Sequence, residues 1–211
     1  FKSQFAAAAK DPFHLVEHPL RRIALVTDLD DPAHESLRAM LHDRFTSFWD
    51  DTAEWTDLVV SEMTVAQLTE ALEEVKPDLI ITYRNLAVAE SPAHSLGAYL
   101  DTMTQVFPCP VLVLPEPNGR DDHTECRNVM VLTDHLAGAD HLVSWGVQVA
   151  PPGGLLVLAH VEDDAVFQRY MNANSKIPEF DTDLARERTE SQLLKEPADY
   201  IESCRAVVQS V

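Results

Sequence analysis

A short apolar segment that occurs twice constrains the fold more than any other part of the sequence. Ile23–Asp28 reads Ile-Ala-Leu-Val-Thr-Asp, and Val129–Asp134 reads Val-Met-Val-Leu-Thr-Asp. Four consecutive apolar residues without polar alternation predict a strand covered on both faces, as in a parallel sheet between two layers of helices. The copies are roughly 100 positions apart, about one small domain. The sequence therefore predicts a tandem repeat of two α/β units.

Apolar spacing and turn residues predict alternating strands and helices in the first unit. Asp30-Asp31-Pro32 is typical of a helix start, and the helix is expected over Ala33–Phe45. Residues 48–57 are expected to be a surface connection. Further strands are expected over 58–60, 79–82 and 111–114, with helices starting at Thr64 and at Ser91-Pro92 between them. This alternation predicts a parallel sheet with right-handed crossovers.

The second unit is expected to lack its last strands. A strand over 129–133, a helix over 139–150 and a strand over 155–161 precede a polar stretch of helical composition, which Pro178 and Pro197 are expected to interrupt. We predict a lead-in over 1–20, a first unit over 21–116, a linker over 117–126 and an incomplete second unit over 127–211. Such a unit would expose a sheet edge.

Composition narrows the classes of partner. The formal net charge of −19 disfavours nucleic acid and anionic lipid, since binding either depends on basic residues that neutralise phosphates. Three cysteines without CxxC spacing indicate reduced thiols. No apolar run approaches the roughly 20 residues that span a bilayer. We expect a soluble, cytoplasmic protein that binds neither nucleic acid nor membranes.

Three segments resemble the universal stress protein (UspA-like) family. They are the strands that end in Thr-Asp, the Pro-Asp-Leu-Ile-Ile strand over 77–81, and Pro-Cys-Pro-Val-Leu-Val-Leu-Pro over 108–115, which is similar to the family's closing strand. The resemblance implies a three-layer α/β/α fold with a parallel sheet, of the adenine-nucleotide α-hydrolase-like type, often paired as dimers or tandem repeats. Some members bind ATP or AMP, with the first-strand Asp facing the nucleotide and a Gly-x-x-Gly loop around the phosphates.

The chain departs from that loop. Where the glycine pair belongs, residues 82–86 read Thr-Tyr-Arg-Asn-Leu, and Gly97 is the first glycine of the chain. The bulk of Tyr83 and Leu86 would occupy the phosphate space, because only glycine lets backbone N–H groups approach phosphate closely there. We therefore expect the nucleotide site of the first unit to be degenerate. The candidate ligand-binding residues are Thr27, Asp28, Leu29, Arg84, Gly97, Thr133, Asp134 and His135.

Most of these candidates also have a purely structural interpretation. Asp28 and Asp134 are as well suited to fixing the turn or capping the next helix as to binding a ligand. Arg84 fits a surface residue better than a phosphate ligand. The spacing of the histidines, including His135 and His160, does not favour a metal site, and Cys109 has no basic neighbour in sequence to activate it.

No motif nominates a nucleophile with its base. The leading hypothesis is a non-catalytic, universal-stress-like binding or interaction module that acts through protein association. We expect it to form a homodimer, or to pair its two units, through sheet edges. The alternative is a universal stress protein that binds ATP or AMP and hydrolyses ATP slowly.

Overall fold

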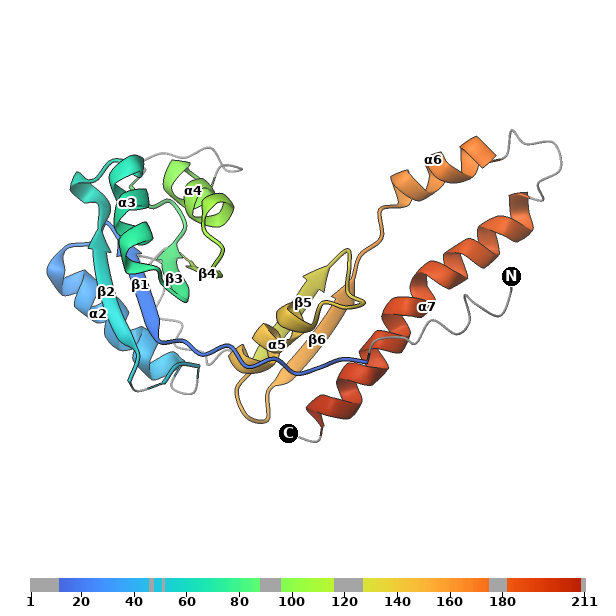
Figure 1. Cartoon of the computed structure of the whole chain (residues 1–211), viewed down its shortest axis with the longest axis horizontal. Coiled ribbons are helices and arrows are strands. Elements are labelled where there is room, and N and C mark those ends of the chain that lie inside the picture. Colours follow the sequence, from blue (N-terminus) through green and yellow to red (C-terminus); the bar gives the residue numbers. More distant parts are fainter. Residues whose placement is uncertain are drawn as a thin grey trace. The chain divides into compact units, whose positions relative to one another are not determined.

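In the computed structural model the chain divides into two compact units (Figure 1). The four-stranded unit is continuous, over Pro19–Glu125, and the two-stranded unit joins Phe1–His18 to Cys126–Val211. The structure describes residues 12–45, 48–50, 52–87, 96–115, 127–174 and 182–209. Both sheets are parallel and helices connect their strands, which confirms the predicted α/β class.

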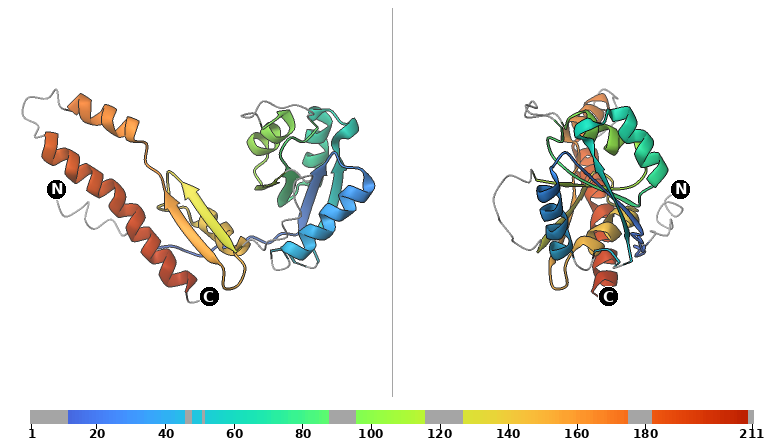
Figure 2. Two further views of the ribbon diagram at one scale, coloured as in Figure 1. Left: turned by 180° about the vertical axis from the view of Figure 1, so that it is seen from behind. Right: turned by 90° about the vertical axis from the view of Figure 1, so that its left-hand side faces the viewer.

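The four-stranded unit is a three-layer α/β/α structure with strand order β2-β1-β3-β4. Its elements are β1 (Arg22–Thr27), α2 (Asp31–Arg44), β2 (Glu54–Val59), a 3-10 turn η1 (Val60–Glu62), α3 (Val65–Val75), β3 (Leu79–Tyr83), α4 (Ala98–Val106) and β4 (Val111–Leu114). Figure 2 shows α2 on one face of this sheet and α3 and α4 on the other. The strand order changes direction between β1 and β3, because the chain first moves outward to β2 and then returns past β1.

Local signals set the helix starts of this unit. The Asp30 carboxylate accepts a hydrogen bond from the Ala33 N–H at 3.2 Å, as the acidic cap before Pro32 predicts. Thr64 and Gln67 form a capping box at the start of α3. The helices expected from these signals are therefore confirmed.

The central strands β1 and β3 hold the core of the four-stranded unit. Residues 23–27 and 79–83 are all buried, so the expected cover on both faces is confirmed for the first copy of the repeated strand. β2 begins at Glu54, earlier than predicted, so the expectation of a surface connection through residue 57 is wrong there. The reason is aromatic packing: Trp55 meets Trp49 edge to face, with ring centroids 5.0 Å apart. The segment is acidic as well as aromatic, and its composition does not show that the two rings meet.

The two-stranded unit places two parallel strands under helices. Its elements are β5 (Asn128–Thr133), α5 (Asp140–Val149), β6 (Leu155–His160), α6 (Asp164–Asn174) and α7 (Thr182–Val208). Val131 of β5, Val143 of α5 and Cys204 of α7 share one core, which Leu156 and Leu158 of β6 border. The helical composition expected after β6 is confirmed by α6 and α7.

Two expectations about the two-stranded unit are wrong. Met130 and Leu132 are exposed, so the second copy of the repeated strand is covered on one face only within the described part of the chain. Pro197 lies inside α7 instead of interrupting it, and it is buried. Tertiary packing of the C-terminal part of α7 offsets the hydrogen bond that a proline removes from a helix. Pro178 lies outside the described residues.

The N-terminal segment Pro12–His18 belongs to the two-stranded unit. The Phe13 N–H donates to the Ser203 hydroxyl of α7 at 2.8 Å, and the Val16 N–H donates to the Ser144 hydroxyl of α5 at 3.0 Å. The Phe13 side chain is buried in the core of this unit. The segment is thus an extended arm that closes a core built from the other end of the chain.

Within the described ranges, no helix combines the length and the apolar character that crossing a bilayer requires.

Candidate functional site

The carboxyl ends of β1 and β3 form the most promising site position in the four-stranded unit. In open parallel sheets ligands bind at the carboxyl edge, where the strand order changes direction. That point lies between β1 and β3, where Thr27 ends one strand and Tyr83 ends the other. The Asp28 carboxylate stands directly after β1, as the sequence predicts for a ligand of this edge.

The chain itself binds the Asp28 carboxylate. The Tyr83 hydroxyl donates to Asp28 Oδ1, and the Ala87 N–H donates to Asp28 Oδ2 at 2.8 Å. The Asp28 N–H donates to the Tyr83 hydroxyl oxygen at 3.0 Å. Both carboxylate oxygens and the backbone of Asp28 are therefore engaged across the gap between β1 and β3.

The turn after β3 closes over this point without glycine. Asn85 and Ala87 adopt left-handed backbone conformations, with φ of 64° and 56°. This region costs a non-glycine residue about 1–2 kcal/mol, so the surrounding contacts must hold the turn in place. Leu86 is buried, and the Ala87 N–H is fixed on Asp28. A backbone N–H that would face phosphate in a glycine loop faces a carboxylate of the protein here.

A chain of polar side chains lies on the other side of β1. Thr27 Oγ1 is 3.0 Å from His34 Nδ1, and His34 Nε2 is 3.3 Å from Asp57 Oδ1. Arg38 donates to the second oxygen of Asp57 at 2.6 Å. The order hydroxyl, imidazole, carboxylate is that of acyl-transfer triads, where the hydroxyl must reach substrate. Thr27 is fully buried, so this chain ties α2 and β2 to β1.

The corresponding edge of the two-stranded unit is built differently. The Thr133 hydroxyl accepts from the His135 N–H at 3.1 Å, while the side chains of Asp134 and His135 are exposed. His160 ends β6, and its Nε2 lies 2.7 Å from a carboxylate oxygen of Glu162. The second Asp of the repeat thus faces solvent, whereas the first is covered.

The remaining predicted residues of the first unit lie before, within and after the turn in sequence. Leu29 is half-buried after Asp28, and Arg84 is exposed at the start of the turn. The Arg84 N–H donates to the Leu114 carbonyl at 3.2 Å, which ties the turn to the end of β4. Gly97, with φ of 84°, precedes the first residue of α4. Their binding roles remain predictions.

Metal and thiol chemistry find little support among the described residues. Among the described residues, no three His, Cys, Asp or Glu side chains are grouped so that they could hold a metal ion. Burial raises the pKa of the Cys109 thiol, and the negative charge of Asp78 raises it further. This thiol is not activated as a nucleophile.

Comparison with known proteins adds no relative. No family model matches the chain, and no curated protein or solved structure matches it. Function must therefore be inferred from the site itself. Sequence reasoning missed His34 and Asp57 as partners of Thr27. Their only signal is a histidine in the helix after β1 and an acidic residue in an edge strand of mixed polarity.

Proposed function

We propose that this protein is a non-catalytic binding or interaction module that resembles universal stress proteins, with a nucleotide site that its own chain has closed. The observation that carries the proposal is the engagement of Asp28 by Tyr83 and Ala87. A nucleotide bound at this edge would have to displace both donors and reopen the turn. It would also meet an acidic chain of net charge −19, which disfavours a polyphosphate.

The proposal assigns the protein's action to association. Edge strands present unpaired N–H and C=O groups that can pair with a strand of another chain. β2 and β4 border the four-stranded sheet, and β4 carries the segment similar to the closing strand of the family. We propose pairing of two copies through such edges and a location in the cytoplasm. The free thiols of Cys109 and Cys204 are compatible with a reducing compartment.

Equilibrium dialysis with labelled ATP and with labelled AMP tests the closed site. We expect no retention at protein and nucleotide concentrations up to the millimolar range, with or without Mg²⁺. The Asp28→Ala variant is the matched control: it removes the carboxylate at this edge, so any retention that depends on the edge is altered in the variant. Retention of ATP or AMP that the variant loses would refute the proposal and favour the nucleotide-binding alternative.

A further inference from the structure

Among the described residues, one face of the β5–β6 sheet is apolar and largely exposed. The parallel register sets Met130 beside Val157 and Leu132 beside Ala159. Paired residues of neighbouring strands point to the same side of a sheet. Together with Leu155, at the amino end of β6, these four residues form what we call the open face. The opposite face carries Val131, Leu156 and Leu158 and packs under α5 and α7.

The open face is more exposed than continuously apolar strands usually are. Met130, Leu132 and Leu155 are 63 %, 59 % and 58 % exposed. Continuous apolar strands of this kind are typical of sheets buried on both sides, as β1 and β3 are. These side chains gather in one apolar patch, which makes the face a candidate interaction surface. The open face therefore needs a cover that the two-stranded unit does not supply.

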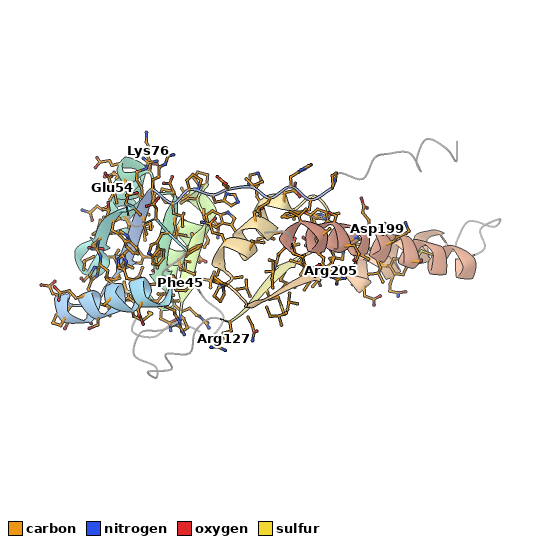
Figure 3. All side chains as sticks on the ribbon, turned by 90° about the horizontal axis from the view of Figure 1, so that it is seen from below. Phe45, Glu54, Lys76, Arg127, Asp199 and Arg205 are labelled. Carbon is orange, nitrogen blue, oxygen red and sulfur yellow. The ribbon has the colours of Figure 1, made fainter. Side chains whose placement is uncertain are left out.

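The charges at the two ends of the open face have opposite sign. Arg127 lies at the amino end of β5, where Figure 3 shows it projecting from the ribbon. Asp134, Glu162 and Asp163 lie exposed just after the carboxyl ends of the two strands. Two such faces stacked with their strands antiparallel bring each Arg127 to the acidic end of the other copy. Parallel stacking would bring the two acidic ends together instead.

We infer that the open face docks a second copy of this chain, sheet against sheet and with the strands antiparallel. A two-fold axis generates this arrangement, because each copy then offers the same patch and receives its complement. The inference rests on the proposed interaction function and names its partner and its surface. It differs from edge pairing, since the side chains of Met130 and Leu132 make the contact.

The size of the face sets the strength of the association. Six-residue strands are about 20 Å long and two of them about 10 Å wide, so one face measures roughly 200 Å². Stable complexes bury about 800 Å² per partner. The dimer is therefore weak and depends on concentration. Each copy carries a net charge of −19, so added salt strengthens the association by screening the repulsion.

Sedimentation velocity on the full chain tests the inference. We expect a monomer at micromolar concentration and a dimer toward the millimolar range. Raising NaCl from about 50 to about 500 mM should shift the equilibrium toward dimer, because the Debye length falls from above to below its value of roughly 10 Å at 0.1 M and the repulsion is screened. Leu132→Asp should weaken the dimer at least about tenfold, the loss expected when a charge is buried in the contact. Leu142→Asp is the matched control, because Leu142 is an exposed leucine of α5 outside the open face.

A charge swap tests the orientation. Arg127→Asp and Asp134→Arg should each weaken the dimer, and the two changes combined should restore it, since the pair is exchanged on both copies. If Leu132→Asp alters the circular dichroism spectrum, Met130→Glu takes its place. A chain that stays monomeric at every concentration, or a dimer that neither variant weakens, overturns the inference. A dimer that Leu132→Asp and Met130→Glu leave intact would refute the docking surface alone, because pairing through sheet edges would still account for it. A chain that stays monomeric would refute both the docking surface and the proposed pairing of two copies, while the dialysis result decides the closed nucleotide site separately.

Discussion

Replacing Gly146 by alanine sets two effects of known size against each other. Gly146 lies in the interior of α5, where alanine is favoured over glycine by about 1 kcal/mol through helix propensity. A Cβ atom at this position would lie 2.4 Å from Cγ2 of Val131 and 3.1 Å from Cδ1 of Leu156. Val131 is buried, and a β-branched side chain has little freedom at χ1.

Overpacking should outweigh helix propensity in this variant. An extra methyl in a well-packed core costs about 1–3 kcal/mol, and an approach of 2.4 Å to the stiff Val131 side chain sets the cost in the upper part of that range, about 2–3 kcal/mol. After the gain of about 1 kcal/mol in helix propensity, we expect a net loss of about 1–2 kcal/mol in the free energy of unfolding. Urea unfolding followed by tryptophan fluorescence measures it, in a Trp49→Phe/Trp55→Phe background that leaves Trp145, the preceding residue, as the probe. The double variant Gly146→Ala/Val131→Ala should be less destabilised than the sum of the singles, because the clashing methyl is gone. A Gly146→Ala protein as stable as the wild type would refute the close approach of α5 to β5.

Three further predictions concern the site and the core of the two-stranded unit. Tyr83→Phe should lower the free energy of unfolding of the four-stranded unit by about 1–2 kcal/mol, because the Asp28 carboxylate loses a donor. In a double-mutant cycle, Tyr83→Phe should cost less in the Asp28→Asn background than in the wild type. Phe13→Ala should cost about 3–5 kcal/mol and release the arm, seen as rapid amide exchange in the two-stranded unit alone. Burial raises the pKa of Cys204 to about 11, from an ordinary value of 9.0, and that of Tyr200 also rises. Because the Cys204 thiol loses its proton at a lower pH in the unfolded chain than in the folded one, the free energy of unfolding should be retained below pH about 9 and fall between pH about 9 and about 11. Urea midpoints measured at pH 8 and at pH 10.5 check this. The fall between the two midpoints should be smaller in Cys204→Ala.

The parts of the fold that sequence predicts are those that neighbouring residues decide. The cap at Asp30 and the capping box at Thr64 involve residues three positions apart, so the helix starts can be read directly. The apolar runs of β1 and β3 mark strands, because a buried strand needs that composition whatever its partners. The parallel α/β architecture follows from the alternation of such segments.

The site depends on distant pairs that no local pattern shows. Tyr83 is 55 positions from Asp28, and the bulk of its side chain predicts an obstructed phosphate loop but not a hydrogen bond that closes it. Nor does the run at Val129–Leu132 show whether a second layer covers it. A strand's composition records that burial is needed, whereas the covering element lies elsewhere in the chain or in another molecule.

The arm gives the molecule an order of assembly. Phe13 meets Ser203 across 190 positions, and the whole four-stranded unit lies between them in sequence. Closing a loop of that length costs roughly 5 kcal/mol by chain statistics, and less once the intervening unit has folded and shortened the free path. During synthesis the four-stranded unit can fold as soon as β4 has emerged, whereas the core around Phe13 must wait for α7. Until then Phe13 of the arm stays without its pocket, so the two-stranded unit becomes stable later than the four-stranded unit.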